Sequence, residues 1–261
     1  MRSNFWSFLT RSSRTVLALI LREMATSYGR SPGGYIWAIA EPVAGIALLT
    51  FIFSLGFQTP PLGISFALFY ASGLVPFLIY SDVSTKISQS INFSLPLLGY
   101  PRVTLADALI ARALLTVMTQ LLVSGLVFGG LITFIDTQSH LDIAKLAQAL
   151  LMAFLLGFGV GSINCFLVTI FPVWQRVWSI LNRPMFLLSC IVFIFEMIPL
   201  PYRDWLWYNP VVHIIGMSRR ALYFGYSGTY VTPIYVYIFS LTLSVCGFFL
   251  IWRFRDRLLN R

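Results

Sequence analysis

The chain has 261 residues, of which 58% are hydrophobic and 10% are charged, and its formal net charge is +9. Soluble domains carry about 25% charged residues, so this composition, with a mean hydropathy of +0.82, excludes an ordinary water-soluble protein. The length allows about six membrane-spanning helices of ~20 residues and leaves no room for a separate soluble catalytic domain. Most basic residues flank apolar runs, so membrane topology explains the positive charge better than nucleic-acid binding does.

Long apolar runs without a single Asp, Glu, Lys or Arg determine the expected fold class. They cover residues 42–81, 113–135, 146–175 and 221–252. A charge at the centre of a bilayer costs ~3 kcal/mol or more, whereas a helix on the surface of a soluble protein keeps one charged face. We therefore expect an all-α polytopic membrane protein. The cysteines lie inside apolar runs, and we expect neither a disulfide framework nor a metal site.

The first segment, residues 1–34, is predicted to be an amphipathic interface helix on the cytoplasmic membrane surface. On a helix, Phe5 and Val16 share an apolar face, while Arg11 and Arg14 share the opposite face. Such a helix carries too many charges to span a bilayer and fits its surface. The Ser-Pro-Gly-Gly sequence before residue 35 then ends the helix and turns the chain.

Residues 35–252 are predicted to form a six-span bundle, followed by a cytoplasmic tail at 253–261, all within one transmembrane domain. The fifth span is the weakest, because Arg183 interrupts it and Glu196 ends it. Small residues in a Gly-x-Gly-x-Gly motif at 157–161 and in a Gly-xxx-Gly motif at 125–129 predict tight helix packing. The expected spans, in chain order, are 35–57, 64–82, 105–135, 144–171, 177–198 and 233–252.

Two connections are longer than a turn requires. Residues 84–104 are numerous enough to include a short helix that docks a soluble partner. Residues 199–232, between spans five and six, are aromatic and amphiphilic. There we expect a pair of short re-entrant helices that dip back from the periplasmic face and are broken at Asn209-Pro210.

The distribution of Lys and Arg in the loops predicts that both termini are cytoplasmic. The opposite side holds Lys145 and a cluster of Arg203, Arg219 and Arg220, which is the exception to the rule. The basic residues assigned to the cytoplasmic side are Arg2, Arg11, Arg14, Arg22, Arg30, Lys86, Arg102, Arg176, Arg183, Arg253, Arg255, Arg257 and Arg261.

The sequence lacks a phosphate-binding loop, in which a Gly-rich turn ends in Gly-Lys-Ser or Gly-Lys-Thr. It also lacks the His-Glu-x-x-His motif of metalloproteases and the Gly-x-Ser-x-Gly motif of serine hydrolases. We therefore expect no enzymatic activity, and no ATP hydrolysis, from this chain alone. Transport against a gradient would draw its energy from a partner chain or from an ion gradient.

Three segments together resemble the membrane permeases of the type-2 ABC exporter superfamily that export capsular polysaccharide. The resemblance covers essentially the whole chain, including its length and expected topology. The segments read Arg-Glu-Met-Ala-Thr at 22–26 with Tyr-Gly-Arg at 28–30 and Gly-Tyr-Ile-Trp at 34–37; Leu-Leu-Gly-Tyr-Pro-Arg at 97–102; and Trp-Tyr-Asn-Pro-Val-Val-His at 207–213 with Arg-Arg at 219–220.

The resemblance implies a permease subunit of an ATP-driven exporter, which moves lipid-linked capsular polysaccharide from the cytoplasm across a bacterial inner membrane. It implies a homodimer in which each protomer docks an ATP-binding subunit. ATP and Mg²⁺ would be bound by that partner, and no cofactor by this chain. The further partners that it implies are a periplasmic polysaccharide co-polymerase, an outer-membrane export channel and membrane lipid.

Candidate contact residues fall into two groups. Arginine binds phosphate and acidic sugars in a forked geometry, and aromatic rings stack on sugar faces. The alternative for these residue types is an interfacial belt against lipid. On the substrate path we expect Arg22, Arg30, Tyr35 and Trp37 at the cytoplasmic entrance, and Tyr202, Trp205, Trp207, Tyr208, Arg219 and Arg220 at the outer end. At the contact with the ATP-binding subunit we expect Lys86, Asn92, Phe93 and Leu97.

Other functions fit parts of the sequence. An O-antigen or teichoic-acid permease of the same superfamily would share these features. Carboxylates near or within the spans favour a proton-coupled secondary transporter, although no inverted repeat is evident. A passive assembly scaffold is a third alternative. The carboxylates concerned are Glu41, Asp82, Asp107 and Glu196.

Overall fold

The computed structural model describes residues 15–25, 35–98, 104–135 and 141–259. Within these ranges the regular structure is entirely helical, which confirms the expected all-α class. Residues 15–25 form the first helix. The elements that follow are α2 (Tyr35–Gly56), α3 (Phe66–Ser88), α4 (Ser90–Leu98), α5 (Leu105–Phe134), α6 (Ile143–Ile170), α7 (Trp174–Leu188), a 3₁₀ turn (Phe195–Met197), α8 (Tyr202–Trp207), α9 (Pro210–Leu222), α10 (Pro233–Arg253) and α11 (Arg255–Leu259).

Five of the described helices are long and apolar enough to cross a membrane, namely α2, α3, α5, α6 and α10. Their bounds agree closely with the expected spans, except that α3 continues beyond Asp82 to Ser88. The extra turns bring Asp82 and Lys86 into the helix. The charge-free runs therefore locate these helices, while polar residues also lie at the end of α3.

The expected fifth span, 177–198, is not a continuous helix. α7 has 15 residues, fewer than the ~20 that a helical crossing needs, and it ends at Leu188. Cys190 has a φ of 62°, a left-handed conformation that terminates helices. Residues 189–194 are consequently non-helical.

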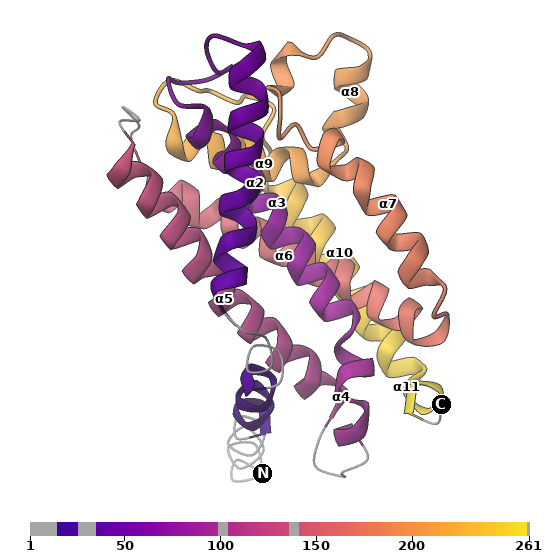
Figure 1. Cartoon of the computed structure of the whole chain (residues 1–261). Helices are drawn as coiled ribbons and strands as arrows, with labels where there is room; N and C mark the ends of the chain where they lie inside the picture. The colour runs from indigo at the N-terminus through magenta and orange to yellow at the C-terminus, as the bar shows by residue number, and fades with distance from the viewer. Residues whose placement is uncertain (1–14, 26–34, 99–103, 136–140, 260–261) are drawn as a thin grey trace.

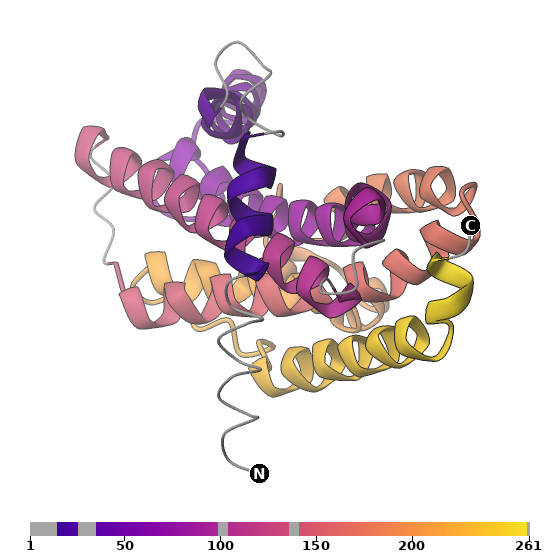
Figure 2. The same cartoon turned by 90° about the horizontal axis from the view of Figure 1, so that it is seen from below.

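α3 and α6 form the centre of the bundle, with α5 packed on α3 and α10 packed on α6 (Figure 1). α2 lies at the margin against α3 and α5. Seen from below, α2 stands apart from the other long helices (Figure 2). Only 11% of its apolar stretch is buried, compared with 72% for α3. α2 therefore presents a large apolar surface to lipid or to another chain.

Glycines of α6 allow three helices to approach closely. A side chain added at Gly157 would come within 2.8 Å of the carbonyl oxygen of Tyr80 in α3. One added at Gly159 would come within 2.6 Å of the carbonyl oxygen of Ser240 in α10. This confirms the tight packing expected from the 157–161 motif. At the 125–129 motif, no described atom lies within 4 Å of the added side chains, so that surface of α5 is open.

The bundle has two distinct ends. Helix 15–25, α4 and α11 lie at one end, called here the α4 end (Figure 1). α8 and α9 lie at the other, the α9 end, where the backbone N–H of Asp142 donates to the carbonyl of Ala221 over 2.8 Å. The short helix expected within 84–104 is present as α4. The expected pair of short helices is present as α8 and α9, which are separated at Tyr208 and Asn209.

A capping box explains one of the carboxylates near a span end. The Thr104 hydroxyl accepts from the backbone N–H of Asp107, and the Asp107 carboxylate accepts from the backbone N–H of Thr104, each over 3.1 Å. Asp107 thus satisfies the free N–H groups at the start of α5. This role accounts for its position without a proton relay.

Candidate functional site

α7 carries a polar stripe along one face. Gln175, Ser179, Asn182 and Arg183 recur at a spacing of three or four residues, which places them on the same side of the helix. No α7 side chain is buried within the single chain. Polar side chains are unstable against lipid, so the stripe must face a wet space or protein. The opposite face is apolar and carries Val177, Ile180, Leu181 and Leu188.

The stripe faces α3 across a groove with a volume of about 660 Å³. The Asn182 side-chain amide donates to the Ser81 hydroxyl over 3.2 Å. The rings of Phe77 and Phe186 pack edge to face with 5.7 Å between their centres. These two contacts hold α7 beside α3. On the α3 side, the polar lining consists of Thr85, Ser88 and Gln89.

The groove combines the side chains that bind carbohydrate. Amides and hydroxyls can bond sugar hydroxyl groups, and Trp178 offers an aromatic ring for a sugar face. Arg183 adds a cation that suits phosphate or acidic sugars. No carboxylate is found among the described residues that line the groove, so an anionic ligand meets no opposing charge there. The arrangement fits a polar, neutral or anionic polymer.

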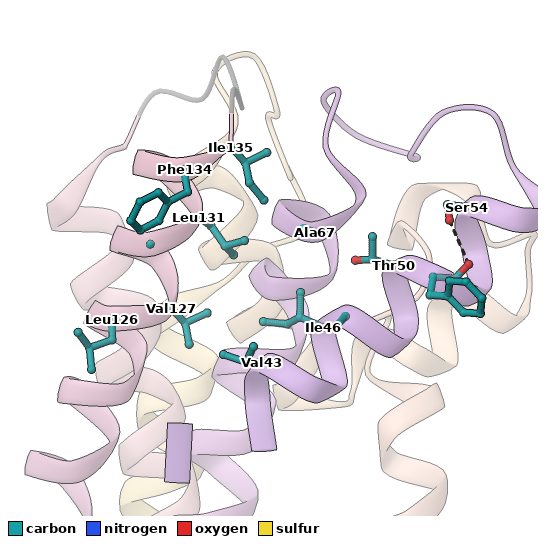
Figure 3. Close-up of a pocket in the computed structure, with 13 residues that line it drawn as sticks. Val43, Ile46, Thr50, Ser54, Ala67, Leu126, Val127, Leu131, Phe134 and Ile135 are labelled. Carbon is teal, nitrogen blue, oxygen red and sulfur yellow. Dashed lines mark hydrogen bonds between the residues drawn. The ribbon is translucent and has the colours of Figure 1, made fainter. Parts of the chain in front are cut away.

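A second groove, between α2 and α5, has the opposite character (Figure 3). Its volume is about 620 Å³, and its lining is apolar apart from Thr50 and Ser54. The Ser54 hydroxyl already donates to the carbonyl of Phe51 over 3.0 Å. Such a surface suits a hydrocarbon chain and offers a glycan almost no hydrogen bonds. The side chains that shape it include Val43, Ile46, Leu126, Leu131 and Phe134, drawn in Figure 3.

At the α4 end, residues expected in two separate sites lie together. The Arg22 guanidinium, expected at the substrate entrance, lies 5.7 Å from the ring centre of Phe93, expected at the partner contact. The Arg112 guanidinium lies 4.5 Å from the same ring. The Arg112 Nε atom is also 3.0 Å from Glu23 Oε1. Glu23 belongs to the segment expected at the cytoplasmic entrance, whereas Arg112 is in neither group of expected contact residues.

Electrostatic effects oppose each other at Glu23. Its burial raises the pKa of the carboxyl group above the ordinary value, while the cations of Arg112, Lys86 and Arg22 act to lower it. Lys86 is half-buried and therefore belongs as much to this cluster as to an outer surface. Asn92 is exposed. The position of Leu97 is described only for its backbone, within α4.

At the α9 end, Arg219 is fully buried, with an exposed fraction of 0%. Its guanidinium donates to the carbonyls of Ile191 and Phe193, each over 2.9 Å, and lies 4.4 Å from the ring centre of Phe69. In this chain Arg219 therefore contacts protein rather than an open path, contrary to the expected contact with substrate. Arg220, its neighbour, is half-buried.

The aromatic residues of α8 divide into two groups. Tyr202, Trp205 and Tyr208 are exposed. Trp207 turns inward: its indole N–H donates to the carbonyl of Tyr230 over 3.2 Å, and its ring stacks on Tyr235 with 5.3 Å between centres. The exposed three can meet a ligand or lipid, whereas Trp207 holds α8 to α10.

The remaining expected entrance residues are Arg30, Tyr35 and Trp37. Arg30 lies outside the described residues. Tyr35 begins α2, and Trp37, two residues later in that helix, is exposed. The expected path also omitted the whole polar stripe of α7. Its signal was present in the sequence, as polar residues with a helical period inside a span that Arg183 interrupts.

The sequence of the described helices matches a known family of membrane proteins. Residues 14–223 match the model of the ABC-2 type transporter family, which is most of the chain. The chain belongs to the ABC-2 type transporter family. The match extends from the N-terminal helix through α9 and so includes α4, α7 and both grooves.

Curated relatives of this ABC-2 chain are similar over nearly its full length. The polysialic acid transport protein KpsM of Escherichia coli is 35% identical over 236 residues, covering 89% of this chain and 90% of the relative. The capsule polysaccharide export inner-membrane protein CtrC of Neisseria meningitidis serogroup B is 25% identical, covering 97% and 96%. The capsule polysaccharide export inner-membrane protein BexB of Haemophilus influenzae is 23% identical, again covering 97% and 96%.

Proposed function

We propose that this chain is the permease subunit of an ATP-driven exporter that moves a lipid-linked capsular polysaccharide across the bacterial inner membrane. The observation that carries the proposal is the groove between α3 and α7, whose polar walls lie beside helices that are apolar enough to span a membrane. The names of the relatives support capsular polysaccharide as the cargo.

The chain crosses the membrane six times in this proposal. Helix 15–25 and α11 lie at the same end of the bundle, which requires an even number of crossings (Figure 1). α7 supplies the sixth, since it starts beside the end of α6, where the Trp174 indole N–H donates to Asn164 over 2.8 Å, and leads toward the α9 end. Its helix of ~22 Å and the non-helical residues 189–194 together exceed the ~30 Å hydrocarbon thickness.

The α4 end is cytoplasmic and the α9 end periplasmic in this proposal. Loops at the α4 end carry most Lys and Arg, as the positive-inside rule requires. α8 and α9 then form the re-entrant pair. The buried guanidinium of Arg219 donates to backbone carbonyls of the segment 189–194. Because these carbonyls are then hydrogen-bonded, the non-helical segment can lie at membrane depth.

The proposed partners follow from the surfaces that a single chain leaves open. A second copy would cover the exposed faces of α7 and α2, which gives a homodimer with the polar groove near its interface. An ATP-binding subunit, carrying ATP and Mg²⁺, would dock on α4, and this chain binds no cofactor itself. The apolar groove between α2 and α5 suits the lipid anchor of the glycan. A periplasmic co-polymerase and an outer-membrane channel would receive the polymer.

Three of the four carboxylates that favoured a proton-coupled transporter have local partners. The Asp82 carboxylate accepts a short hydrogen bond from the Gln120 amide. The Tyr226 hydroxyl donates to Glu196 over 3.0 Å. Asp107 caps α5. Asp82, Asp107 and Glu196 thus have structural roles, and Glu41 is exposed on α2, so the exporter is the function that the geometry supports better.

The groove is tested by removing its cation. Arg183→Gln should lower polysaccharide export about tenfold, because a charge-assisted hydrogen bond contributes about 1.5–3 kcal/mol and 1.4 kcal/mol corresponds to a factor of ten. Arg176→Gln is the matched control, since Arg176 is on the same helix but does not line the groove. Export is measured as surface glycan in cells with equal amounts of assembled permease. Equal export by both variants would reject the α3–α7 groove as the path.

A further inference from the structure

The α4 end holds an ion pair between helices that are far apart in the sequence. Among the residues that the structure describes, the pair of Glu23 and Arg112 is the one that joins two helices, 3.0 Å apart. Each side chain is 10% exposed. Separating a buried ion pair is strongly unfavourable, because each charge would be left in the protein interior without its partner. The pair therefore fixes helix 15–25 on α5.

Arg112 also connects this pair to α4. Its terminal guanidinium nitrogen donates to the carbonyl of Gln89 over 3.4 Å, at the turn between α3 and α4. The Phe93 ring of α4 lies 4.5 Å from the same guanidinium and 5.7 Å from that of Arg22. One cation thus contacts three segments of chain. Such contacts between cation and ring strengthen when they are shielded from water.

The remaining contacts of helix 15–25 are on the same side. Leu19 and Glu23 are its buried residues, and their spacing of four places them on one face of the helix. This face lies toward the bundle, while Leu17 and Leu21 are exposed on the outside. The buried residues of this helix thus share one face, and the ion pair lies at one end of that face.

We propose that Glu23, Arg112 and Phe93 form a joint that makes helix 15–25 and α4 a single rigid body, so that displacement of α4 by the ATP-binding subunit also moves helix 15–25. The proposal rests on the proposed function in taking α4 as the docking element. It assigns Arg112 and Glu23 as positioning residues, which act on transport through the helices that they join.

The first test measures whether the two helices move together. Ala18→Cys and Asn92→Cys place spin labels at exposed positions of helix 15–25 and α4, in a Cys246→Ser background because Cys165 and Cys190 are buried. In the complex with the ATP-binding subunit, the distribution of distances between the labels should be narrow and should not change when a non-hydrolysable ATP analogue is added. Arg112→Gln should broaden this distribution. Asp256→Asn, in the exposed pair with Arg255, is the control and should not.

The second test measures coupling. Glu23→Gln and Arg112→Gln should each lower the glycan exported per ATP hydrolysed by about tenfold, within the usual range of coupling effects. The exchanged pair Glu23→Arg with Arg112→Glu should recover only part of this ratio, because a carboxylate at 112 restores the ion pair but neither donates to Gln89 nor pairs with the Phe93 ring. If Arg112→Gln does not assemble, Arg112→Lys replaces it. Lysine keeps the positive charge but lacks the forked guanidinium, so the distribution of label distances should also broaden.

Either of two results would overturn the joint. One is an 18–92 distance that changes with nucleotide in the otherwise unaltered protein, since the helices would then be two bodies. The other is an unchanged narrow distance in Arg112→Gln or Arg112→Lys. The distance measurement needs nucleotide and the partner subunit but no glycan. Its failure is therefore distinguishable from failure of the polysaccharide assignment, which would appear as absent export by the unaltered exporter.

Discussion

Arg219 shows how a single side chain can support an interruption in a helical protein. The non-helical segment 189–194 leaves carbonyls outside the helical pattern, and Arg219 donates to those of Ile191 and Phe193. A buried carbonyl without a donor costs about 1–3 kcal/mol. The arginine therefore stabilises the segment that links α7 to the α9 end, and its exception to the expected charge distribution has a structural explanation.

Replacement of this arginine should destabilise the protein. Arg219→Met should lower the thermal unfolding temperature in detergent by roughly 5 °C or more, because two carbonyls lose their donors. Arg219→Lys should recover only part of the loss, since an ammonium group lacks the two-pronged geometry. The half-buried neighbour supplies the control, and Arg220→Met should change the temperature little. Equal effects of the two methionine variants would contradict this role.

α4 is the element through which a soluble partner would act. Its side chains divide by direction: Ile91 is buried, Phe93 faces the arginines, and Asn92 and Leu95 are exposed. Phe93, expected at the partner contact, lies on the arginine side, so in the proposed docking the exposed face with Asn92 and Leu95 would meet the partner. A short helix with one buried face and one open face can transmit movement from a docked subunit.

An acidic residue on the open face of α4 should separate the partner. Leu95→Glu should reduce co-purification of the ATP-binding subunit at least about tenfold, because hot-spot residues at interfaces contribute 2 kcal/mol or more. The stability of the isolated permease should not change, as Leu95 is exposed. Arg257→Glu on α11 introduces a carboxylate at an exposed site of the same end and should retain the partner. Full retention by Leu95→Glu would place docking elsewhere.

For the whole molecule, the number of crossings depends on α7. Five helices satisfy the length and hydropathy of a span, yet both described ends of the chain lie at the α4 end (Figure 1). A short helix continued by non-helical chain is viable in a membrane only where protein or water covers the exposed backbone. The α3–α7 groove and the Arg219 contacts provide that cover from within one chain, and a second copy would complete it.

Thiol labelling distinguishes six crossings from five. In the Cys246→Ser background, Trp205→Cys and Phe224→Cys should react with a membrane-impermeant reagent in intact cells from which the outer membrane has been removed. Asn92→Cys and Asp256→Cys should react only after the inner membrane is opened. All four positions are exposed in the chain. If 205 and 224 react from the same side as 92, α7 does not cross, and the proposed topology is wrong.

Local sequence signals determined where helices begin and end. The charge-free runs located five long helices, and Asn209-Pro210 marked the start of α9, because the asparagine side chain accepts from the N–H of Val211 and proline fits the first helical turn. Residues 84–104 had the length for α4. The prediction of a continuous fifth span was wrong, because hydropathy does not indicate that Cys190 adopts a left-handed conformation and ends the helix.

Only the tertiary structure decided which residues meet. Arg219 lies 26 residues after the carbonyl of Phe193, and Arg112 is far in sequence from Glu23, so no local pattern connects them. Such pairings depend on the rotation and tilt of each helix in the bundle, which packing at positions such as Gly157 determines. The sequence thus determined the membrane class, the helices and the polar stripe of α7. The packing determined that the stripe faces α3 and that the entrance and docking residues share one cluster.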